Sequence, residues 1–193
     1  MNICTYSYEE YLNMVKSFHG NLAPGLVIGG FMVDLAMKNL PKGEFFDAIC
    51  ETPVCLPDAV QLLTPCTIGN GWLSIVPFGR FAITFYEKYT GEGVRVYLDT
   101  KKLNNWPEVR DWYLKKKKKS EQDADLLFGQ IREAGHGLLS VQKVQVDPEK
   151  VRRKKTGPVG FCPVCGEAYP LRDGDSCRNC QGETPYSSVT AVS

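Results

Sequence analysis

The chain has 193 residues, a formal net charge of +1, 43% hydrophobic residues and 23% charged residues. This composition is typical of a folded globular protein and excludes a disordered or fibrous chain. No apolar run approaches the roughly 20 residues that a membrane-spanning helix needs, so no membrane association is expected. The first residues, MNICTYSYEE, carry an acidic pair where a secretory signal would be basic. We therefore expect a cytoplasmic protein whose cysteines are thiols or metal ligands rather than disulfides.

The first third of the chain predicts helices around a buried strand. Apolar residues at helical spacing indicate an amphipathic helix over residues 6–18 and a buried helix over 24–40, which begins at Pro24. A buried strand is expected at 44–52, and a short helix at 57–64.

Three glycines, Gly25, Gly29 and Gly30, lie in the N-terminal half of the buried helix. They would let another helix approach closely, and that helix could belong to a second subunit. A dinucleotide-binding role is disfavoured, because no strand and turn precede these glycines.

The following segments predict a three-stranded meander, two helices and a last strand. The strands of the meander are expected at 71–78, 81–89 and 93–100, the helices at 106–119 and 121–135, and the last strand at 138–146. Helices and strands do not alternate regularly, so the predicted fold class is α+β, with a mixed helix and antiparallel-sheet core. The lysine run 115–119 is interpreted as the solvated face of an exposed helix rather than an anion-binding patch.

Four cysteines near the C-terminus form two C-x-x-C pairs, Cys162 with Cys165 and Cys177 with Cys180. Zinc binds four thiolates tetrahedrally, and a gap of two residues lets both sulfurs of a pair turn toward one ion. A thioredoxin-like redox motif would need a following helix in a larger fold, which this segment lacks. The spacing therefore predicts a small structural zinc ribbon, a type of zinc finger, held by all four cysteines.

The residues around the two pairs support this prediction. Gly166 and Gly182 follow the pairs and suit the tight turn that each pair makes. Asp173-Gly174 is typical of a hairpin turn, which would bring the two pairs together.

Charge and composition divide the chain into a core domain at 1–149, a basic linker at 150–157 and the zinc ribbon with its tail at 158–193. Residues 1–149 carry 16 basic and 18 acidic side chains, and residues 150–155 carry five basic side chains and no acidic one. Residues 156–193 carry two basic and four acidic side chains. Positive charge therefore lies in the linker and not in the ribbon, which disfavours the ribbon as a nucleic-acid-binding surface.

Outside the ribbon, Cys55 and Cys66 flank the predicted short helix. Cys55 lies at its N-terminal end, where backbone N–H groups and the helix dipole favour a thiolate, whereas Cys66 lies beyond its C-terminal end. Asp58 lies in the first turn, as a charge that suits that end and as a possible ligand or hydrogen-bond partner. His19 immediately precedes the buried helix, a position that disfavours the imidazolium form. A lone histidine or cysteine can equally be structural, and both interpretations stay open on these residues alone.

The remaining candidates are interpreted as structural. Cys50 lies in the apolar strand and is expected to pack in the core, and Cys4 near the terminus is uninformative. His136 is expected to be a residue at the C-terminal end of a helix.

Two motifs together resemble a known family. The segment Phe18-His-Gly-Asn-Leu-Ala-Pro-Gly25 is similar to the F-H-G-H-x-[CA]-P-G signature of the FmdE-like proteins, which are related to formylmethanofuran dehydrogenase. The segments Cys55-Leu-Pro-Asp-Ala-Val-Gln61 and Thr64-Pro-Cys-Thr-Ile-Gly-Asn-Gly71 resemble the second signature of that family, and Tyr89-Thr-Gly-Glu-Gly-Val-Arg95 matches as well. The resemblance covers about residues 8–146, and the C-terminal ribbon is an addition that some members carry.

The resemblance implies an α+β core that forms tightly intertwined homodimers, with a metal site built around His19 and Cys55 and, less directly, Cys66. Because each of the first two precedes a predicted helix, we expect them to share one site, for a metal of zinc, nickel or iron type. Asn21 and Ala23 stand where the family signature has a histidine and a cysteine option. Both departures remove good transition-metal ligands and leave positions for water.

The leading functional hypothesis is a metal-binding accessory or regulatory protein, with a core His19/Cys55 site and a ribbon that contacts another macromolecule or senses metal. One alternative is an enzyme in which the core metal activates water or substrate. A second is a nucleic-acid-binding or transcription-linked protein that uses the basic linker beside the ribbon.

The charge distribution yields a prediction that tests the second alternative. Because only six clustered residues supply positive charge, binding to DNA or RNA should be weak, independent of sequence and steeply reduced by salt. Filter-binding or fluorescence-anisotropy titrations at two salt concentrations measure this. A tight, salt-resistant complex with one sequence would reverse the ranking of the two hypotheses.

Overall fold

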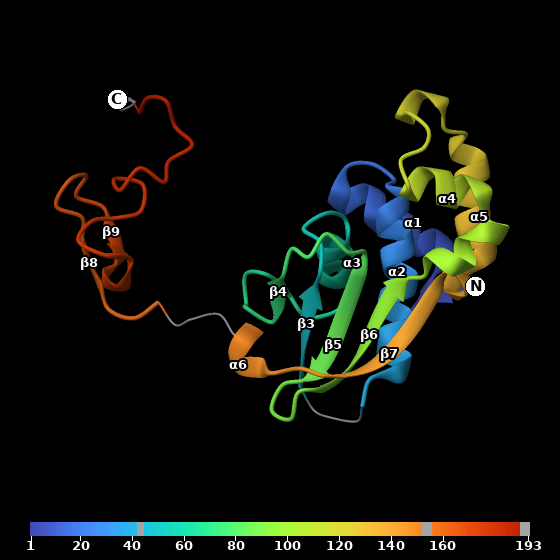
Figure 1. The fold of residues 1–193 in the computed structure, drawn as a ribbon, viewed down its shortest axis with the longest axis horizontal. Coiled ribbons are helices and arrows are strands. Elements are labelled where there is room, and N and C mark those ends of the chain that lie inside the picture. Colours follow the sequence, from blue (N-terminus) through green and yellow to red (C-terminus); the bar gives the residue numbers. More distant parts are fainter. Residues whose placement is uncertain (42–44, 152–155, 190–193) are drawn as a thin grey trace. The chain divides into compact units, whose positions relative to one another are not determined.

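The structure is a computed structural model that describes residues 1–41, 45–151 and 156–189. The chain divides into two compact units, residues 1–152 and 153–193 (Figure 1). Most of the predicted basic linker, residues 152–155, lies outside the described residues. The short helix α6 (Pro148–Val151) belongs to the first unit, and its last carbonyl accepts a hydrogen bond from the Ser74 hydroxyl at 3.2 Å. Among the described residues, no helix is long and apolar enough to cross a membrane.

The first unit is built on a mixed five-stranded sheet in the order β4-β3-β5-β6-β7. The strands are β3 (Phe46–Cys50), β4 (Leu73–Ile75), β5 (Ala82–Glu87), β6 (Glu92–Leu98) and β7 (Leu139–Gln145). All neighbours are antiparallel except β3 and β4, which are parallel. The α+β class with a mixed helix and sheet core is therefore confirmed.

Helices bury the inner face of this sheet. They are α1 (Tyr8–His19), α2 (Pro24–Asn39), α3 (Leu56–Leu63), α4 (Pro107–Tyr113) and α5 (Ala124–Ala134). Helix α2 is buried along most of its length and packs on β5 and β6 (Figure 1). A short hairpin, β1 (Asn2–Ile3) with β2 (Tyr6–Ser7), precedes α1, and Ser7 begins α1 with a capping box to Glu10.

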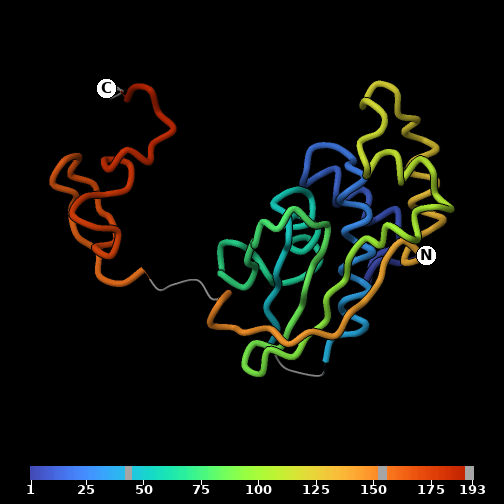
Figure 2. The backbone as a smooth tube through the Cα atoms, viewed as in Figure 1, coloured from blue at the N-terminus to red at the C-terminus, as the bar shows by residue number. Residues whose placement is uncertain are grey.

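The predicted three-stranded meander is wrong in one strand. β5 and β6 form the expected antiparallel hairpin, but β4 lies at the opposite edge, parallel to β3. The reason is the intervening helix α3, since parallel neighbours need a crossover connection and α3 supplies it (Figure 2). The hydrophobic pattern of a strand does not reveal its neighbour.

The segment after β6 also differs from the prediction. The 3-10 helix η1 (Thr100–Asn105) precedes α4, which ends at Tyr113. The lysine run 115–119 therefore lies in the connection from α4 to the short 3-10 helix η2 (Lys119–Glu121), not on a long helix. One of these lysines, Lys117, pairs with Glu108 at 2.6 Å.

The glycines of α2 allow close packing within the same chain. A side-chain carbon added at Gly29 would lie 2.7 Å from the Ala59 Cβ of α3, and one added at Gly30 would overlap the Tyr11 ring of α1. A carbon added at Gly25 would lie 2.9 Å from the Cys55 Sγ. These glycines therefore admit α1, α3 and the Cys55 side chain, rather than a helix of a second protomer.

A buried carboxylate ties the N-terminal hairpin to the helices. The side chain of Asp34 on α2 accepts a hydrogen bond from the Cys4 backbone N–H at 2.9 Å and pairs with Lys38 at 2.6 Å. The His136 Nε2, in the 3-10 helix η3 (Gly135–Leu138), lies 2.7 Å from the same carboxylate, and the His136 ring stands edge-on to Phe31. His136 thus follows the end of α5 and contacts structural groups only, and Cys50 is fully buried in the core.

The second unit is small and contains one hairpin, β8 (Val159–Phe161) with β9 (Ala168–Pro170), and the 3-10 helix η4 (Leu171–Asp173). The hairpin encloses the first cysteine pair. The expected turn at Asp173-Gly174 is instead the end of η4, where the Gly174 N–H is donated to the Leu171 carbonyl. The hairpin thus forms within the first half of the module and not between its halves.

The close approach at Gly29 yields a stability prediction. Gly29→Ala should lower the free energy of unfolding of the first unit by about 1–3 kcal/mol, because α2 and α3 must separate to admit a methyl group. The matched control is Gly129→Ala in the exposed part of α5, where nothing lies within 4 Å of the added carbon. That change should be stabilising by up to about 1 kcal/mol. Denaturant unfolding of the full chain measures both, and equal effects would contradict the packing argument.

Candidate metal centres

The four cysteines of the second unit form one cluster. Their sulfur atoms all lie within 4.8 Å of one another, and the Cys165 and Cys177 sulfurs are 3.8 Å apart. Four sulfurs about 2.3 Å from one zinc ion at tetrahedral angles would be separated by about 3.8 Å. The donor set and the spacing therefore fit a structural Zn²⁺, as the sequence predicts.

Backbone geometry prepares these sulfurs for a metal. Gly166 and Gly182 have φ values of 80° and 97°, a left-handed conformation that lets the chain turn back after each pair. The Cys177 N–H points at the Cys162 sulfur over 3.4 Å. Backbone N–H groups, first that of Cys165 and then that of Cys177, lower the pKa of Cys162 to about 6. A metal ligand must be a thiolate, so these N–H groups stabilise the form that zinc binds.

A second candidate centre lies where three helix ends meet in the first unit. His19 is the last residue of α1, and its Nδ1 lies 2.9 Å from the Asp58 Oδ2 in the first turn of α3. Each of these side chains is about one-third exposed. The sequence placed His19 before the N-terminus of α2, where a cation is disfavoured, but the C-terminal end of α1 favours one. The Asp58 carboxylate also leaves Nε2 as the ring nitrogen available to a ligand.

Cys55 lies at the start of α3, facing α2. It is the N-cap residue of α3 with φ 61°, a conformation that non-glycine residues rarely adopt, and its sulfur packs against Gly25. Burial, and then the charge of Asp58, raise the pKa of Cys55. This direction is opposite to the thiolate that the helix N-terminus led us to expect. The helix contributes no capping hydrogen bond to this side chain, so burial and Asp58 decide the direction.

A buried ion pair fixes the segment that leads to Cys55. The Glu51 carboxylate, which follows β3, accepts two hydrogen bonds from Arg95 at 2.6 and 2.9 Å and one from Arg80 at 2.6 Å. Although burial opposes it, the hydrogen bonds from Arg95 lower the pKa of Glu51. The loop from Glu51 to Cys55 therefore begins at a rigid point of the sheet.

The structure thus brings His19, Asp58 and Cys55 to adjoining helix ends, through the His19–Asp58 pair and the contact of Cys55 with Gly25. It does not close a three-ligand cluster there. Within the described ranges, the four cysteines of the second unit form the one group of three or more such side chains whose ligand atoms lie within 4.8 Å of one another. A shared metal site at His19 and Cys55 stays a prediction.

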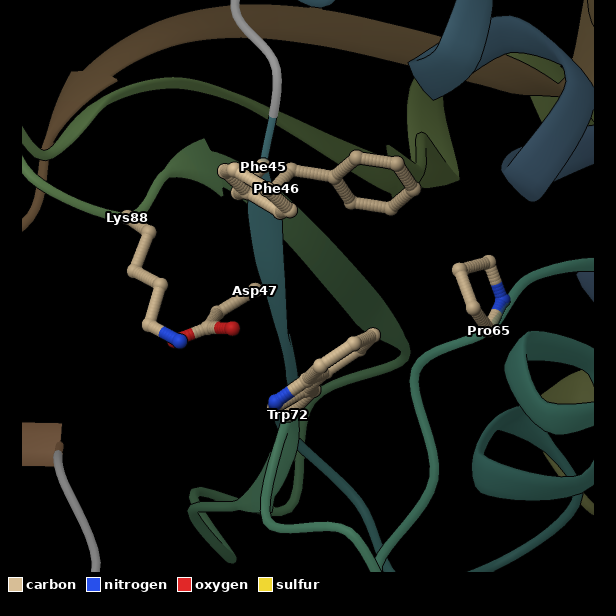
Figure 3. A pocket seen from close by; sticks show the side chains of 6 residues that line it. All are labelled: Phe45, Phe46, Asp47, Pro65, Trp72 and Lys88. Atoms are coloured by element: carbon tan, nitrogen blue, oxygen red, sulfur yellow. The ribbon is translucent and has the colours of Figure 1, made fainter.

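Cys66 belongs to a different neighbourhood. It lies beyond the C-terminal end of α3, an eight-residue helix about 12 Å long that separates it from Cys55. Its sulfur is buried and contacts the Phe46 carbonyl at 3.5 Å, and burial raises its pKa to about 11. Near it is a pocket lined by Phe45, Phe46, Asp47, Pro65, Trp72 and Lys88 (Figure 3). Cys66 is therefore not placed with His19 and Cys55.

Asp58 is the residue whose importance the sequence understated. Sequence reasoning placed it first as a charge suited to the helix N-terminus, and only second as a hydrogen-bond partner. The 39 positions between it and His19 give no local signal of their pairing. Metal-binding histidines usually donate their other ring N–H to a carboxylate, so this contact is the kind of partner that a histidine ligand needs.

Comparisons with known proteins agree with this architecture. A family profile described as "FmdE, Molybdenum formylmethanofuran dehydrogenase operon" matches residues 18–146. The chain belongs to the FmdE family. A second profile, "FmdE treble clef zinc finger", matches residues 153–187, so the four-cysteine module predicted as a ribbon is a treble clef zinc finger.

Two individual proteins are similar over most of this FmdE chain. A solved structure from Syntrophus aciditrophicus, described as an FmdE-like protein of tungsten formylmethanofuran dehydrogenase, is 56% identical with a TM-score of 0.87. The match covers 96% of this chain and 97% of that one. A curated Archaeoglobus fulgidus protein named "Probable S-adenosyl-L-methionine-binding protein" is 30% identical over 188 residues. The match covers 86% of this chain, and the chain spans about half the length of that protein.

The zinc finger yields the second stability prediction. Cys162→Ser or Cys177→Ser should remove about one zinc per chain and unfold residues 158–183, because metal binding supplies the folding free energy of such a module. The first unit, with its own core, should keep its unfolding transition. Elemental analysis and near-ultraviolet circular dichroism measure the two effects, with Cys4→Ser as the control that keeps zinc. A serine variant with a full zinc complement would refute the four-cysteine assignment.

Proposed function

We propose that this FmdE protein is a metal-binding accessory or regulatory protein, with His19 and Cys55 as ligands of a core transition metal. The observation that carries the proposal is the 2.9 Å contact between the His19 Nδ1 and Asp58. It holds the imidazole in the orientation and tautomer that leave Nε2 for a metal. Cys55 begins the same helix that bears Asp58, so both side chains depend on the position of α3.

The donor set suits zinc, nickel or iron. Imidazole and thiolate are ligands for these metals, and the loss of the Cys55 proton on binding would overcome its raised pKa. The two signature positions that could add ligands are Asn21 and Ala23, and Ala23 begins α2 without a side-chain cap. With two strong protein ligands, the remaining coordination positions would hold water or an exchangeable ligand. Such an open site suits sensing or delivery of a metal, and a closed structural site does not.

The accessory role draws on the family description, which names a formylmethanofuran dehydrogenase operon, and on the Syntrophus relative. An enzyme remains the alternative, because open coordination positions also suit activation of bound water. The same two ligands serve both alternatives, so metal binding is the first property to test.

The proposal extends to partners. We infer a cytoplasmic homodimer, consistent with exposed apolar side chains beside the core site at Phe18 and Val54, the neighbours of His19 and Cys55. The zinc finger would contact a further protein rather than nucleic acid, since four acidic and two basic side chains follow residue 155.

Cobalt titration tests the core site. With zinc in the finger, Co²⁺ added to the full chain should give a near-ultraviolet thiolate-to-cobalt absorption, because Cys55 becomes a ligand. His19→Ala and Cys55→Ser should abolish it. Asp58→Asn should weaken binding about 10–100-fold, since the carboxylate only orients the imidazole.

The matched control is Cys66→Ser, a cysteine at the other end of α3, which should leave the titration unchanged. Elemental analysis confirms that finger zinc stays in place throughout. The proposal fails if His19→Ala binds cobalt as the wild type does, or if Cys66→Ser abolishes the signal.

A further inference from the structure

The hairpin of the zinc finger exposes an apolar face. Cross-strand partners in a sheet have side chains on the same face. Val159 pairs with Pro170, and Phe161 pairs with Ala168. Successive strand residues alternate between faces, so these four apolar side chains share one face. Phe161 is 82% exposed and Val159 58% exposed.

The opposite face of the hairpin is the one that the module packs. Gly160 pairs with Tyr169, which is buried, and the Tyr169 hydroxyl donates a hydrogen bond to the Gly174 carbonyl at 2.9 Å. A side-chain carbon at Gly160 would lie 2.6 Å from Leu171, so Leu171 covers this glycine. The small core of the finger therefore uses Gly160, Tyr169 and Leu171. Folding of the module does not explain apolar residues on the other face, where a two-sided hairpin would normally carry polar ones.

The apolar surface continues into the first cysteine pair. Val164 lies between Cys162 and Cys165 in the turn that the hairpin encloses, and it is 73% exposed. Its position between two ligands does not require an apolar side chain, because the turn is formed by the backbone and Gly166. Contiguous exposed apolar side chains of this kind mark interaction sites in soluble proteins.

Charge restricts the partner. The side chains of residues 156–193 carry about −2, and four thiolates with one Zn²⁺ add about −2 more. An acidic module with an apolar face repels nucleic acid and anionic membranes. Residues 1–149 are also net negative, with 18 acidic and 16 basic side chains, which disfavours the core of a second copy as the occupant. A protein segment that presents apolar side chains between basic ones is complementary in both properties.

We propose that the face formed by Val159, Phe161, Ala168 and Pro170 is the docking surface for an extended segment of another protein, in which apolar and basic residues alternate. An extended segment suits the two-stranded hairpin, whose outer edges are free to pair with a further strand among the described residues. The inference rests on the proposed contact function of the finger and names its partner class. It does not depend on a metal at His19 and Cys55.

Nuclear magnetic resonance of the zinc-loaded full chain tests this proposal. The probe is a short peptide of alternating leucine and lysine, which should shift the amide signals of residues 159–161 and 168–170. Peptides of alternating leucine and glutamate, and of serine and lysine, should bind at least ten-fold more weakly, because each lacks one of the two properties.

Variants separate the apolar face from general stickiness. The double variant Val159→Thr, Phe161→Ser should keep its zinc and lose at least ten-fold in affinity for the leucine–lysine peptide. Tyr186→Ser, which removes an aromatic side chain 65% exposed in the same module, is the matched control and should bind as the wild type does. Zinc content verifies that each variant is folded.

Three outcomes would overturn the proposal. The first is equal binding of the leucine–lysine peptide by the double variant, and the second is equal binding of the leucine–glutamate peptide by the wild type. The third is a hairpin face that is already covered in the free protein, which sedimentation would show as an oligomer that the double variant dissociates. A loss of cobalt binding at the core site with peptide binding retained would instead refute only the core metal.

Discussion

The arrangement of the core site depends on how closely α2 approaches its neighbouring helices. Gly25 and Gly29 face α3, and Gly30 faces the Tyr11 ring of α1, at distances that admit no additional carbon atom. The Tyr11 hydroxyl donates a hydrogen bond to the Leu26 carbonyl at 2.8 Å and fixes α1 against the start of α2. Because α1 and α3 both pack against the same short stretch, the end of one and the start of the other meet. His19 and Asp58 lie at that meeting point, so their hydrogen bond is a consequence of glycine spacing in a helix that contributes no ligand itself.

Cys55 shows what this packing costs and what holds it. Its positive φ is a strained conformation for a residue with a side chain, and such strain persists only when the surroundings determine the backbone on both sides. On one side the loop begins at Glu51, which two arginines hold at the end of β3. On the other side α3 packs on Gly29. The cysteine is therefore oriented by an ion pair and a helix contact, neither of which a motif around Cys55 would reveal.

This division explains which parts of the structure the sequence could predict. The two C-x-x-C pairs carry their own geometry, and local spacing was enough for the zinc site. The positions of α2, β3 and α3 followed from apolar periodicity. The edge position of β4 did not, because pairing between β3 and β4 is decided by a crossover, and the same apolar strand pattern fits either edge. The His19–Asp58 pair was also beyond prediction, since 39 positions separate the residues. The pKa of Cys55 moved opposite to expectation because burial, a property of the tertiary structure, outweighed the helix terminus.

The two candidate metal centres differ in what the protein needs them for. In the finger the sulfurs surround a common centre, the module has few other buried residues, and metal binding supplies the free energy of folding. The first unit has a continuous buried core from α1 through β7, so its fold does not need a metal. A metal bound at His19 and Cys55 would contribute little to that fold and would be free to leave without unfolding it. Stable ligands in the finger and exchangeable ones in the core are the combination expected of a protein that keeps a permanent contact surface while its metal occupancy changes.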